Sequence, residues 1–140
     1  MAVDAYLNFK GNCREAVEFY AEAFGTEQPK FMTFGEIPAS PEHPVPDEAK
    51  NWIMHTRLKI SGSNVMFSDV FPGMPFTEGN NISLALVTDS KEELVSAYEK
   101  LKEGGTVIME LQETFWAPYY GSVRDKFGIE WQFNLGMSEM

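Results

Sequence analysis

Residues 5–25 read AYLNFKGNCREAVEFYAEAFG and predict a short strand followed directly by a helix. Residues 5–9 are rich in apolar side chains, and Asn12 with Glu15 three positions later predicts a helix N-cap with a capping box. Apolar side chains then recur at helical spacing, at Ala16, Val17, Tyr20, Ala23 and Phe24. Gly25 stands where a residue in the left-handed conformation would end that helix.

Further strands are predicted in the rest of the N-terminal half. Apolar-rich runs predict strands at residues 31–34, 51–60 and 64–70. The sequence Ser-Gly-Ser at 61–63 predicts a compact hairpin between the last two strands. Residues 36–50 contain four prolines and no periodicity, which predicts an exposed loop.

After a proline- and glycine-rich connector at residues 71–80, the same order of elements begins again. A strand at 82–87 precedes a helix that Asp89 or Ser90 caps and that Gly104 ends. Three more strands are predicted, at residues 106–109, 115–123 and 129–135.

The two halves of the chain, at about 4–72 and 80–136, thus share the order strand, helix, strand, strand, strand. This mixture of helical and strand periodicity predicts an α+β fold. A half of about 70 residues is too short to bury its sheet alone. We therefore expect residues 1–140 to form one domain that unfolds as a unit.

The 140 residues are 44% hydrophobic and only 23% charged, which is typical of a chain with a hydrophobic core and excludes wholesale disorder. The chain has 11 Lys and Arg against 21 Asp and Glu, so its formal net charge is -10. Phosphate backbones and anionic lipid surfaces repel such a chain. Nucleic acids and membrane surfaces are therefore not expected as partners.

Cys13 is the only cysteine, which suits a reducing compartment. The N-terminal residues lack a basic region followed by an apolar run, and no uncharged apolar stretch is long enough to cross a bilayer. We therefore expect a cytoplasmic protein. At a helix start the dipole would lower the pKa of the Cys13 thiol, although a structural role is the more frequent one for such a cysteine.

Three blocks of sequence stand in order along the chain. They are YLNFxGNCxEAxxFY, ending in FG, at residues 6–25; MHxxLxIxG, running to SD, at 54–69; and FW with YGxVxDxFGxxW at 115–131. Together they extend from about residue 6 to 134. This set resembles the PhnB-like branch of the vicinal oxygen chelate superfamily, which also holds glyoxalases, bleomycin-resistance proteins and extradiol dioxygenases.

The resemblance implies paired βαβββ modules, in which a curled mixed sheet surrounds a cavity and the helices lie outside. It also implies a homodimer. Members of this branch are often described as 3-demethylubiquinone methyltransferase-like. In this sequence, however, no strand is followed by a glycine-rich turn that would hold S-adenosylmethionine.

Enzymes of the superfamily hold a divalent metal ion with His, Glu or Gln at four strand positions. The resemblance aligns these positions with Ala5, Met66 or Phe67, Ser83 and Gln132. Only Gln132 has a side chain of an accepted type, and the others do not bind a hard or borderline divalent ion. We therefore expect neither the standard metal site nor a cofactor.

His55 and Asp69 are candidates for a different polar site. The predicted hairpin would bring their strands side by side, so that the two form either part of a metal site or a hydrogen bond within the sheet. His55, Arg57 and Lys59 share one side of their strand, which either faces solvent or lines the cavity of a curled sheet. His43 lies in the proline loop, where a functional role is the rarer alternative.

The sequence FWAPYY, which includes Trp116 and Tyr120, is the densest aromatic run. Aromatic side chains with a few polar groups are typical of small-molecule pockets, and they are also common in cores. We select Trp116 and Tyr120 as pocket candidates and add Arg124. Arg124 would either meet an anionic ligand or pair with Asp125 or Glu130 on the surface.

A retained fold with lost metal ligands favours a metal-free protein that binds a small apolar or aromatic molecule. Its pocket candidates are His55, Asp69, Trp116, Tyr120, Arg124 and Gln132. The alternative is a lyase- or oxidoreductase-type enzyme, or another metal-assisted enzyme, that uses His55 with Asp69 and Gln132. A third hypothesis is a structural role through the dimer surface. The residues alone do not decide whether any reaction is catalysed.

Overall fold

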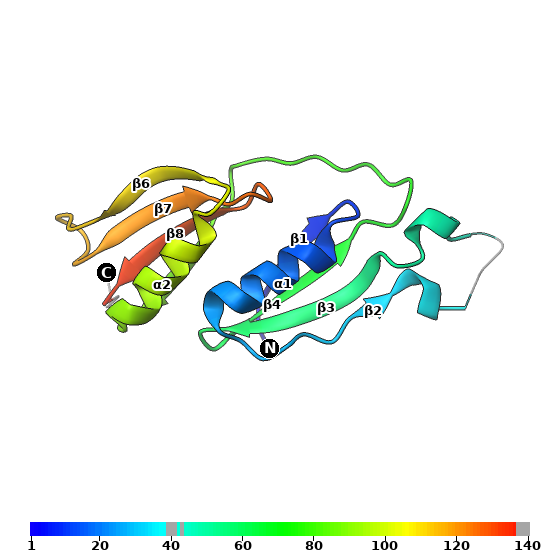
Figure 1. Ribbon diagram of the computed structural model, residues 1–140, viewed down its shortest axis with the longest axis horizontal. Coiled ribbons are helices and arrows are strands. Elements are labelled where there is room, and N and C mark those ends of the chain that lie inside the picture. The colour runs from blue at the N-terminus through cyan, green and yellow to red at the C-terminus, as the bar shows by residue number, and fades with distance from the viewer. Residues whose placement is uncertain (39–41, 43, 137–140) are drawn as a thin grey trace. The chain divides into compact units, whose positions relative to one another are not determined.

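A computed structural model describes residues 1–38, 42 and 44–136. The chain divides into two units, Met1–Thr77 and Glu78–Met140. Each unit contains one α-helix and one four-stranded sheet, in the order strand, helix, strand, strand, strand (Figure 1). The predicted α+β class and the repeated βαβββ module are therefore confirmed. No helix in the described part of the chain is long and apolar enough to cross a membrane.

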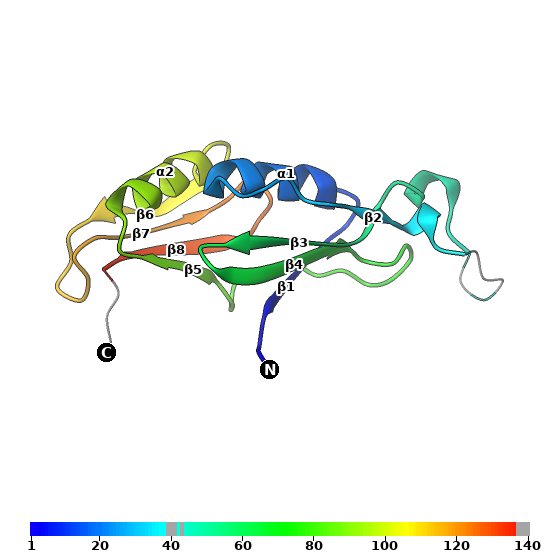
Figure 2. The same cartoon turned by 90° about the horizontal axis from the view of Figure 1, so that it is seen from below.

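The N-terminal unit is built from β1 (Ala5–Phe9), α1 (Cys13–Phe24), β2 (Met32–Thr33), β3 (Ile53–Ile60) and β4 (Ser63–Asp69). Its sheet has the strand order β1-β4-β3-β2, in which β1 runs parallel to β4 and the other pairs are antiparallel. The helix α1 lies along one side of this sheet (Figure 2). Tyr20 of α1 stacks on Phe67 of β4 with 5.8 Å between ring centroids, so the core of the unit lies on this side.

The C-terminal unit is built from β5 (Leu84–Thr88), α2 (Lys91–Leu101), β6 (Thr106–Gln112), β7 (Tyr120–Arg124) and β8 (Glu130–Leu135). Its strand order is β5-β8-β7-β6, with β5 parallel to β8. Tyr98 of α2 meets Phe133 of β8 edge to face at 5.5 Å between ring centroids. Each sheet is open and is not closed into a barrel.

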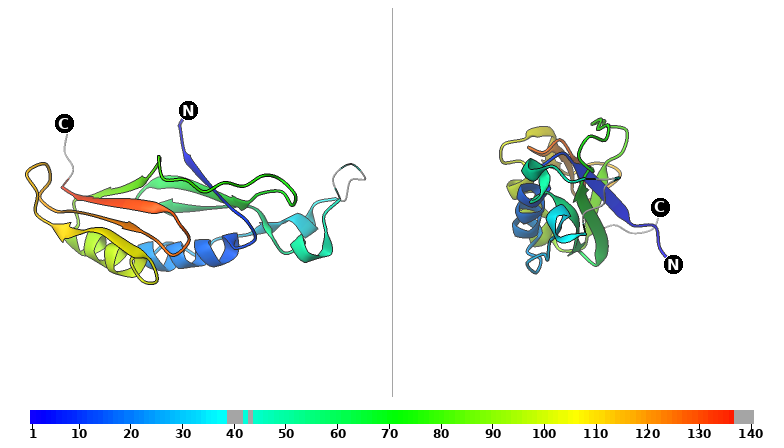
Figure 3. Two further views of the ribbon diagram at one scale, coloured as in Figure 1. Left: turned by 90° about the horizontal axis from the view of Figure 1, so that it is seen from above. Right: turned by 90° about the vertical axis from the view of Figure 1, so that its right-hand side faces the viewer.

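Side chains alternate between the two sides of a sheet, so each sheet also has a side that faces away from the helix of its unit, here called the open face (Figure 3). The strand register places on the open face of the N-terminal sheet Tyr6, Asn8, His55, Arg57, Lys59, Asn64, Met66 and Ser68. It places on the open face of the C-terminal sheet Ala85, Val87, Tyr120, Ser122, Arg124, Gln132 and Asn134. Both open faces mix polar with apolar side chains.

The helix ends follow the sequence except at the N-terminus of α1 and the C-terminus of α2, which ends at Leu101 and not at Gly104. Gly25 ends α1 in the left-handed conformation, with φ 64°, and Ser90 caps α2 by accepting a hydrogen bond from the Glu93 N–H at 3.2 Å. The capping box predicted for Asn12 and Glu15 is wrong, because the Asn12 side chain makes no cap hydrogen bond. A carboxylate from another strand occupies that place, as described below.

The strand predicted at residues 31–34 is shorter than expected. It ends at Thr33 because Phe34–Glu36 forms a 3₁₀-helix, and the Glu36 carboxylate accepts a hydrogen bond from the Thr33 N–H at 2.7 Å. The proline loop that follows contains a second 3₁₀-helix, Asp47–Ala49. His43, in the same loop, lies outside the described residues.

The strand predicted at 115–123 begins later, at Tyr120. Thr114 and Ala117 close a turn before it: the Ala117 carbonyl accepts from the Thr114 N–H, and the Ala117 N–H donates to Thr114 Oγ1 at 3.1 Å. This turn leaves Phe115 and Trp116 outside any strand. Conversely, β6 continues to Gln112, beyond the predicted range of 106–109.

Candidate functional site

Asp69 lies at the end of β4 and is only 2% exposed. One carboxylate oxygen accepts hydrogen bonds from the N–H groups of Gly11 and Cys13 at 2.7 and 3.1 Å, and the other accepts from the Ile53 N–H at 2.8 Å. The carboxylate therefore joins the β1–α1 junction and the start of β3 to the end of β4. It also places a negative charge at the N-terminus of α1, where the helix dipole favours it.

His55 and Asp69 lie on opposite sides of the N-terminal sheet. Asp69 continues the helix-facing row that contains Phe67, whereas His55 lies on the open face. There His55 neighbours Tyr6, whose hydroxyl oxygen is 3.4 Å from His55 Nδ1. The structure does not bring His55 and Asp69 together. Asp69 therefore cannot act beside His55 in the metal-assisted enzyme that the sequence offered as the alternative function.

Cys13, in the first turn of α1, is fully buried. Burial, and after it the negative charge of Asp69, raises the pKa of the Cys13 thiol far above its usual value. This corrects the expectation that the helix dipole would lower the pKa. The structure supports a structural role for Cys13, which the sequence already favoured over a reactive thiol.

We expect Cys13 to be unreactive in the folded protein. At pH 8 a thiol-specific chromogenic disulfide should modify the native chain at least about 100-fold more slowly than the urea-unfolded chain, because the native thiol is both inaccessible and protonated. A small cysteine-containing peptide, measured with and without urea, controls for the effect of urea on the reagent. Equal rates for the native and unfolded chains would contradict this prediction.

Trp116, Tyr120 and Gln132 all lie in the C-terminal unit. The rings of Trp116 and Tyr120 meet at 5.5 Å between centroids, and Phe115 meets Trp116 edge to face at 4.9 Å. Tyr120 lies on the open face, and Ser122, two residues further along β7, faces Gln132 of β8 in register. The aromatic cluster therefore adjoins a polar row on the same sheet.

Arg124 also lies on this open face, opposite Glu130 in register. Asp125 points elsewhere, since its carboxylate accepts hydrogen bonds from two backbone N–H groups and one indole N–H at 2.8, 3.1 and 2.9 Å. Among the ion pairs of the described residues, none joins Arg124 to either acid. The Arg124 guanidinium thus forms neither of the two surface ion pairs, with Asp125 or with Glu130, that the sequence suggested.

The four positions aligned with metal ligands divide between the two units. Ala5 and Phe67 lie on the helix-facing side of the N-terminal sheet. Of the two residues aligned with the second ligand position, Met66 and Phe67, only Met66 lies on the open face. In the other unit Gln132 Nε2 donates to Ser83 Oγ at 2.9 Å. No three His, Cys, Asp or Glu side chains gather as metal ligands within the described ranges.

Tyr6 and Ser122 are open-face residues that sequence reasoning did not select. Tyr6 lies beside Met66 in register and next to His55, and Ser122 lies beside Gln132. Strand alternation from Tyr120 would have placed Ser122 on the same side, but its neighbour depends on the cross-strand register, which one sequence does not reveal.

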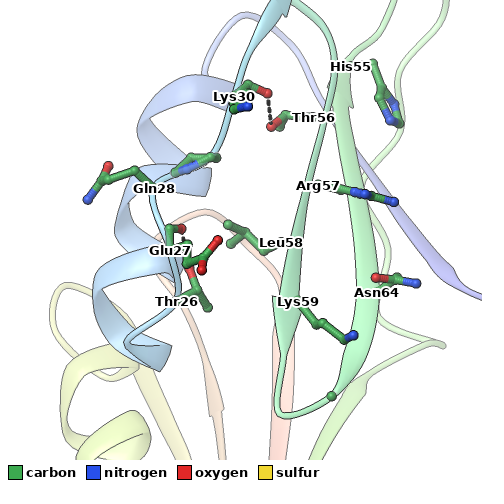
Figure 4. Close-up of a pocket in the computed structure, with 12 residues that line it drawn as sticks. Thr26, Glu27, Gln28, Lys30, His55, Thr56, Arg57, Leu58, Lys59 and Asn64 are labelled. Carbon is green, nitrogen blue, oxygen red and sulfur yellow. Dashed lines mark hydrogen bonds between the residues drawn. The ribbon is translucent and has the colours of Figure 1, made fainter.

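A groove of about 1090 Å³ runs beside β3 in the N-terminal unit (Figure 4). It is lined by the segment after α1, by β3 and by the start of β4, through Thr26, Glu27, Gln28, Pro29, Lys30, His55, Thr56, Arg57, Leu58, Lys59, Gly62 and Asn64. Thr56 Oγ1 donates to the Lys30 carbonyl oxygen at 2.8 Å, which holds the segment against β3.

A family model described as 3-demethylubiquinone-9 3-methyltransferase matches residues 2–134. The chain belongs to this PhnB-like family. Protein YjdN of Escherichia coli K12 is 36% identical over 147 residues, which cover 96% of this chain and 95% of YjdN. The crystal structure of protein PA1353 from Pseudomonas aeruginosa is 36% identical, with a TM-score of 0.83 over 96% of this chain and 97% of that one.

Two further solved structures are similar to this chain. The PhnB protein of Bacillus cereus, described as a putative 3-demethylubiquinone-9 3-methyltransferase, is 25% identical with a TM-score of 0.72, over 97% of this chain and all of that one. A glyoxylase/bleomycin resistance protein/dioxygenase domain from Frankia is 14% identical with a TM-score of 0.65, over 100% of this chain and 94% of that one, and it shows the fold alone. The resemblance to the PhnB-like branch is therefore confirmed, and the likeness to the Frankia domain is one of fold.

The turns from strand into helix show whether this chain could hold a methyltransferase cofactor in the usual way. In folds that hold a nucleotide cofactor, the turn from a strand into a helix offers free N–H groups to the cofactor. In the turn from β1 into α1, the N–H groups of Gly11 and Cys13 donate hydrogen bonds to Asp69 and are not available to a cofactor. The corresponding turn before α2 is capped by Ser90. Neither turn fits a cofactor held in that way.

Proposed function

We propose that this PhnB-like protein binds a small aromatic or apolar molecule on the open face of its C-terminal sheet, without the metal ion of the superfamily's enzymes. The observation that carries the proposal is the contact between the Trp116 and Tyr120 rings beside the row formed by Ser122 and Gln132. An apolar wall next to a few polar groups is the usual composition of a small-molecule site.

The exposure of the aromatic cluster supports this role over a core role. Trp116 is 48% exposed and Phe115 is 96% exposed, although both side chains are large and apolar. The two rings meet edge to face, an arrangement that leaves ring faces available to a further ring. Large exposed apolar groups that gather in one place are typical of binding surfaces.

The polar neighbours would orient the bound molecule. The Gln132 amide nitrogen is already committed to Ser83 at 2.9 Å, which fixes the amide and directs its oxygen as a hydrogen-bond acceptor. Ser122 supplies a hydroxyl in the same row. Arg124, two residues beyond Ser122, would meet an acidic substituent at the far end of a longer ligand.

We propose further that the protein acts as a homodimer, as the resemblance to the PhnB-like branch implies, and that it acts in the cytoplasm, where a single unpaired cysteine is usual. Sedimentation velocity of the full chain should give a single species of about twice the 15.8 kDa of the chain. A monomer at all concentrations tested would contradict this part of the proposal.

A thermal-shift screen of aromatic and apolar compounds tests the binding function. At a concentration 100 times its Kd, a ligand that binds only the native state stabilises it by about 2.7 kcal/mol, which raises the melting temperature by several degrees. Hits are then confirmed by equilibrium dialysis. A screen in which no compound stabilises the chain or is retained in dialysis would contradict the proposal.

Trp116→Ala is expected to weaken binding of such a hit about tenfold, because one aromatic contact contributes about 0.5–1.5 kcal/mol beyond its buried area. Phe31→Ala is the matched control, since it removes a partly exposed ring from the other unit. Dialysis with both variants is the measurement. Equal losses in the two variants would show that the ligand does not use the Trp116 cluster.

A further inference from the structure

The groove beside β3 collects positive charge in a chain whose formal net charge is -10. Lys30, His55, Arg57 and Lys59 line it, with Glu27 as the one acidic residue among its described lining. The two lysines and the arginine are charged at neutral pH. The groove therefore has a charge opposite in sign to that of the whole chain.

His55, Arg57 and Lys59 form a row along β3. They occupy alternate positions, so they leave the strand on the same side at intervals of about 7 Å. Asn64 of β4 faces Lys59 in register and adds an amide to the row. Figure 4 shows His55, Arg57 and Lys59 on one side of β3 and Thr56 and Leu58 on the other. The row is thus a continuous strip of hydrogen-bond donors.

In the described part of the chain, the ion pairs of lysines join Lys50, Lys100 and Lys102 to nearby acids, and no ion pair involves Lys30, Arg57 or Lys59. Neighbouring cations repel one another, and the chain has 21 acidic residues from which partners are available. An arrangement that keeps Arg57 and Lys59 together on one side of β3 without acidic partners is one that a bound anion would stabilise.

We propose that this groove binds the phosphate group of a small molecule. A phosphate dianion matches the charge of Arg57 and Lys59, which leave β3 on the same side, better than the single charge of a carboxylate does. Guanidinium, ammonium and amide N–H groups are its usual donors. The groove lies within the N-terminal unit, so this inference does not rest on the ligand site proposed for the C-terminal sheet.

Nuclear magnetic resonance of the full ¹⁵N-labelled chain tests the proposal. Inorganic phosphate, methyl phosphate and acetate are titrated separately at constant ionic strength and pH. We expect both phosphates to give saturable shifts of the amide resonances of residues 55–64, and acetate to give none at the same concentrations. If methyl phosphate has the lower Kd, the ligand class is a phosphate ester. If inorganic phosphate has the lower Kd, the ligand is the free ion.

Lys59→Gln and Arg57→Gln should each weaken phosphate binding at least about fivefold, because each removes a charged hydrogen-bond donor. Lys10→Gln makes the same change in net charge as Lys59→Gln at an exposed lysine outside the groove lining, and it should change the affinity less than about twofold. Shifts that do not saturate, equal shifts with acetate, or an equal loss in Lys10→Gln would each overturn the proposal.

Discussion

Asp69→Asn is expected to lower the free energy of unfolding by about 3 kcal/mol or more. The Asp69 carboxylate is 2% exposed and accepts three backbone hydrogen bonds, from Gly11, Cys13 and Ile53. An asparagine of the same shape has one acceptor oxygen, and its amide nitrogen would face N–H donors in place of the second oxygen. At least one buried N–H group is then left without an acceptor, and the helix N-terminus loses its negative charge.

Urea unfolding followed by tryptophan fluorescence measures the effect of Asp69→Asn. Asp47→Asn is the matched control, because Asp47 pairs with Lys50 at 2.9 Å but its side chain is 93% exposed. An exposed pair of this kind contributes about 0–1 kcal/mol, so the control should unfold close to the wild-type midpoint. If the two variants lose the same stability, the Asp69 hydrogen bonds do not have the role assigned to them.

Phe133→Ala should lower the free energy of unfolding by about 3–5 kcal/mol. Phe133 is 0% exposed and packs edge to face against Tyr98 of α2. Removing the ring leaves a cavity between α2 and β8 that the two elements fill only partly. Phe115→Ala makes the same chemical change at a ring that is 96% exposed, and its effect should stay below about 0.5 kcal/mol.

The Phe133→Ala variant also tests whether the two halves, at about 4–72 and 80–136, unfold as one domain. Neither half is large enough to be expected to fold alone, so we propose that they unfold together. Hydrogen exchange of β4 and β8, measured in peptides from each half, should then become faster by the same factor in both. Faster exchange confined to residues 80–136 would show that the halves unfold separately.

The elements that depend on local signals were predictable from the sequence. The α1 and α2 helices follow from the spacing of their apolar residues, and their limits follow from Gly25 and Ser90, which act within one turn of the chain. The N-cap of α1 was not predictable in the same way. Its acceptor is Asp69, 58 residues from Gly11, and the nearby Asn12 offered a sufficient local explanation.

The relation between His55 and Asp69 depended on the length of a single turn. The sequence suggested a loop at residues 61–63, which would place His55 directly opposite Asp69. In the structure Ile60 pairs with Ser63, and a two-residue turn joins them through Ser61 and Gly62, with φ 48° and 91°. A change of one residue in register moves a side chain to the other side of a sheet, so Asp69 faces the helix instead.

The aromatic cluster is formed by residues that are close in sequence, so its internal contacts depend on local structure alone. Trp116 and Tyr120 are four residues apart, so a single turn is enough to bring their rings together. The polar part of that site, Gln132 with Ser122, depends on the pairing of β7 with β8. The row of cations along β3 was visible in the sequence, but the side of the sheet that it occupies was not.

The parallel pairing of β1 with β4 has a consequence for synthesis on the ribosome. Ala5 pairs with Val65, so β1 has no strand partner until the chain has been extended by some 60 residues. At elongation rates of about 5–20 residues per second, this interval lasts about 3–12 s. During that time the apolar side of α1 has no sheet to cover it, which makes the nascent N-terminal half a natural client for chaperones that bind exposed apolar segments.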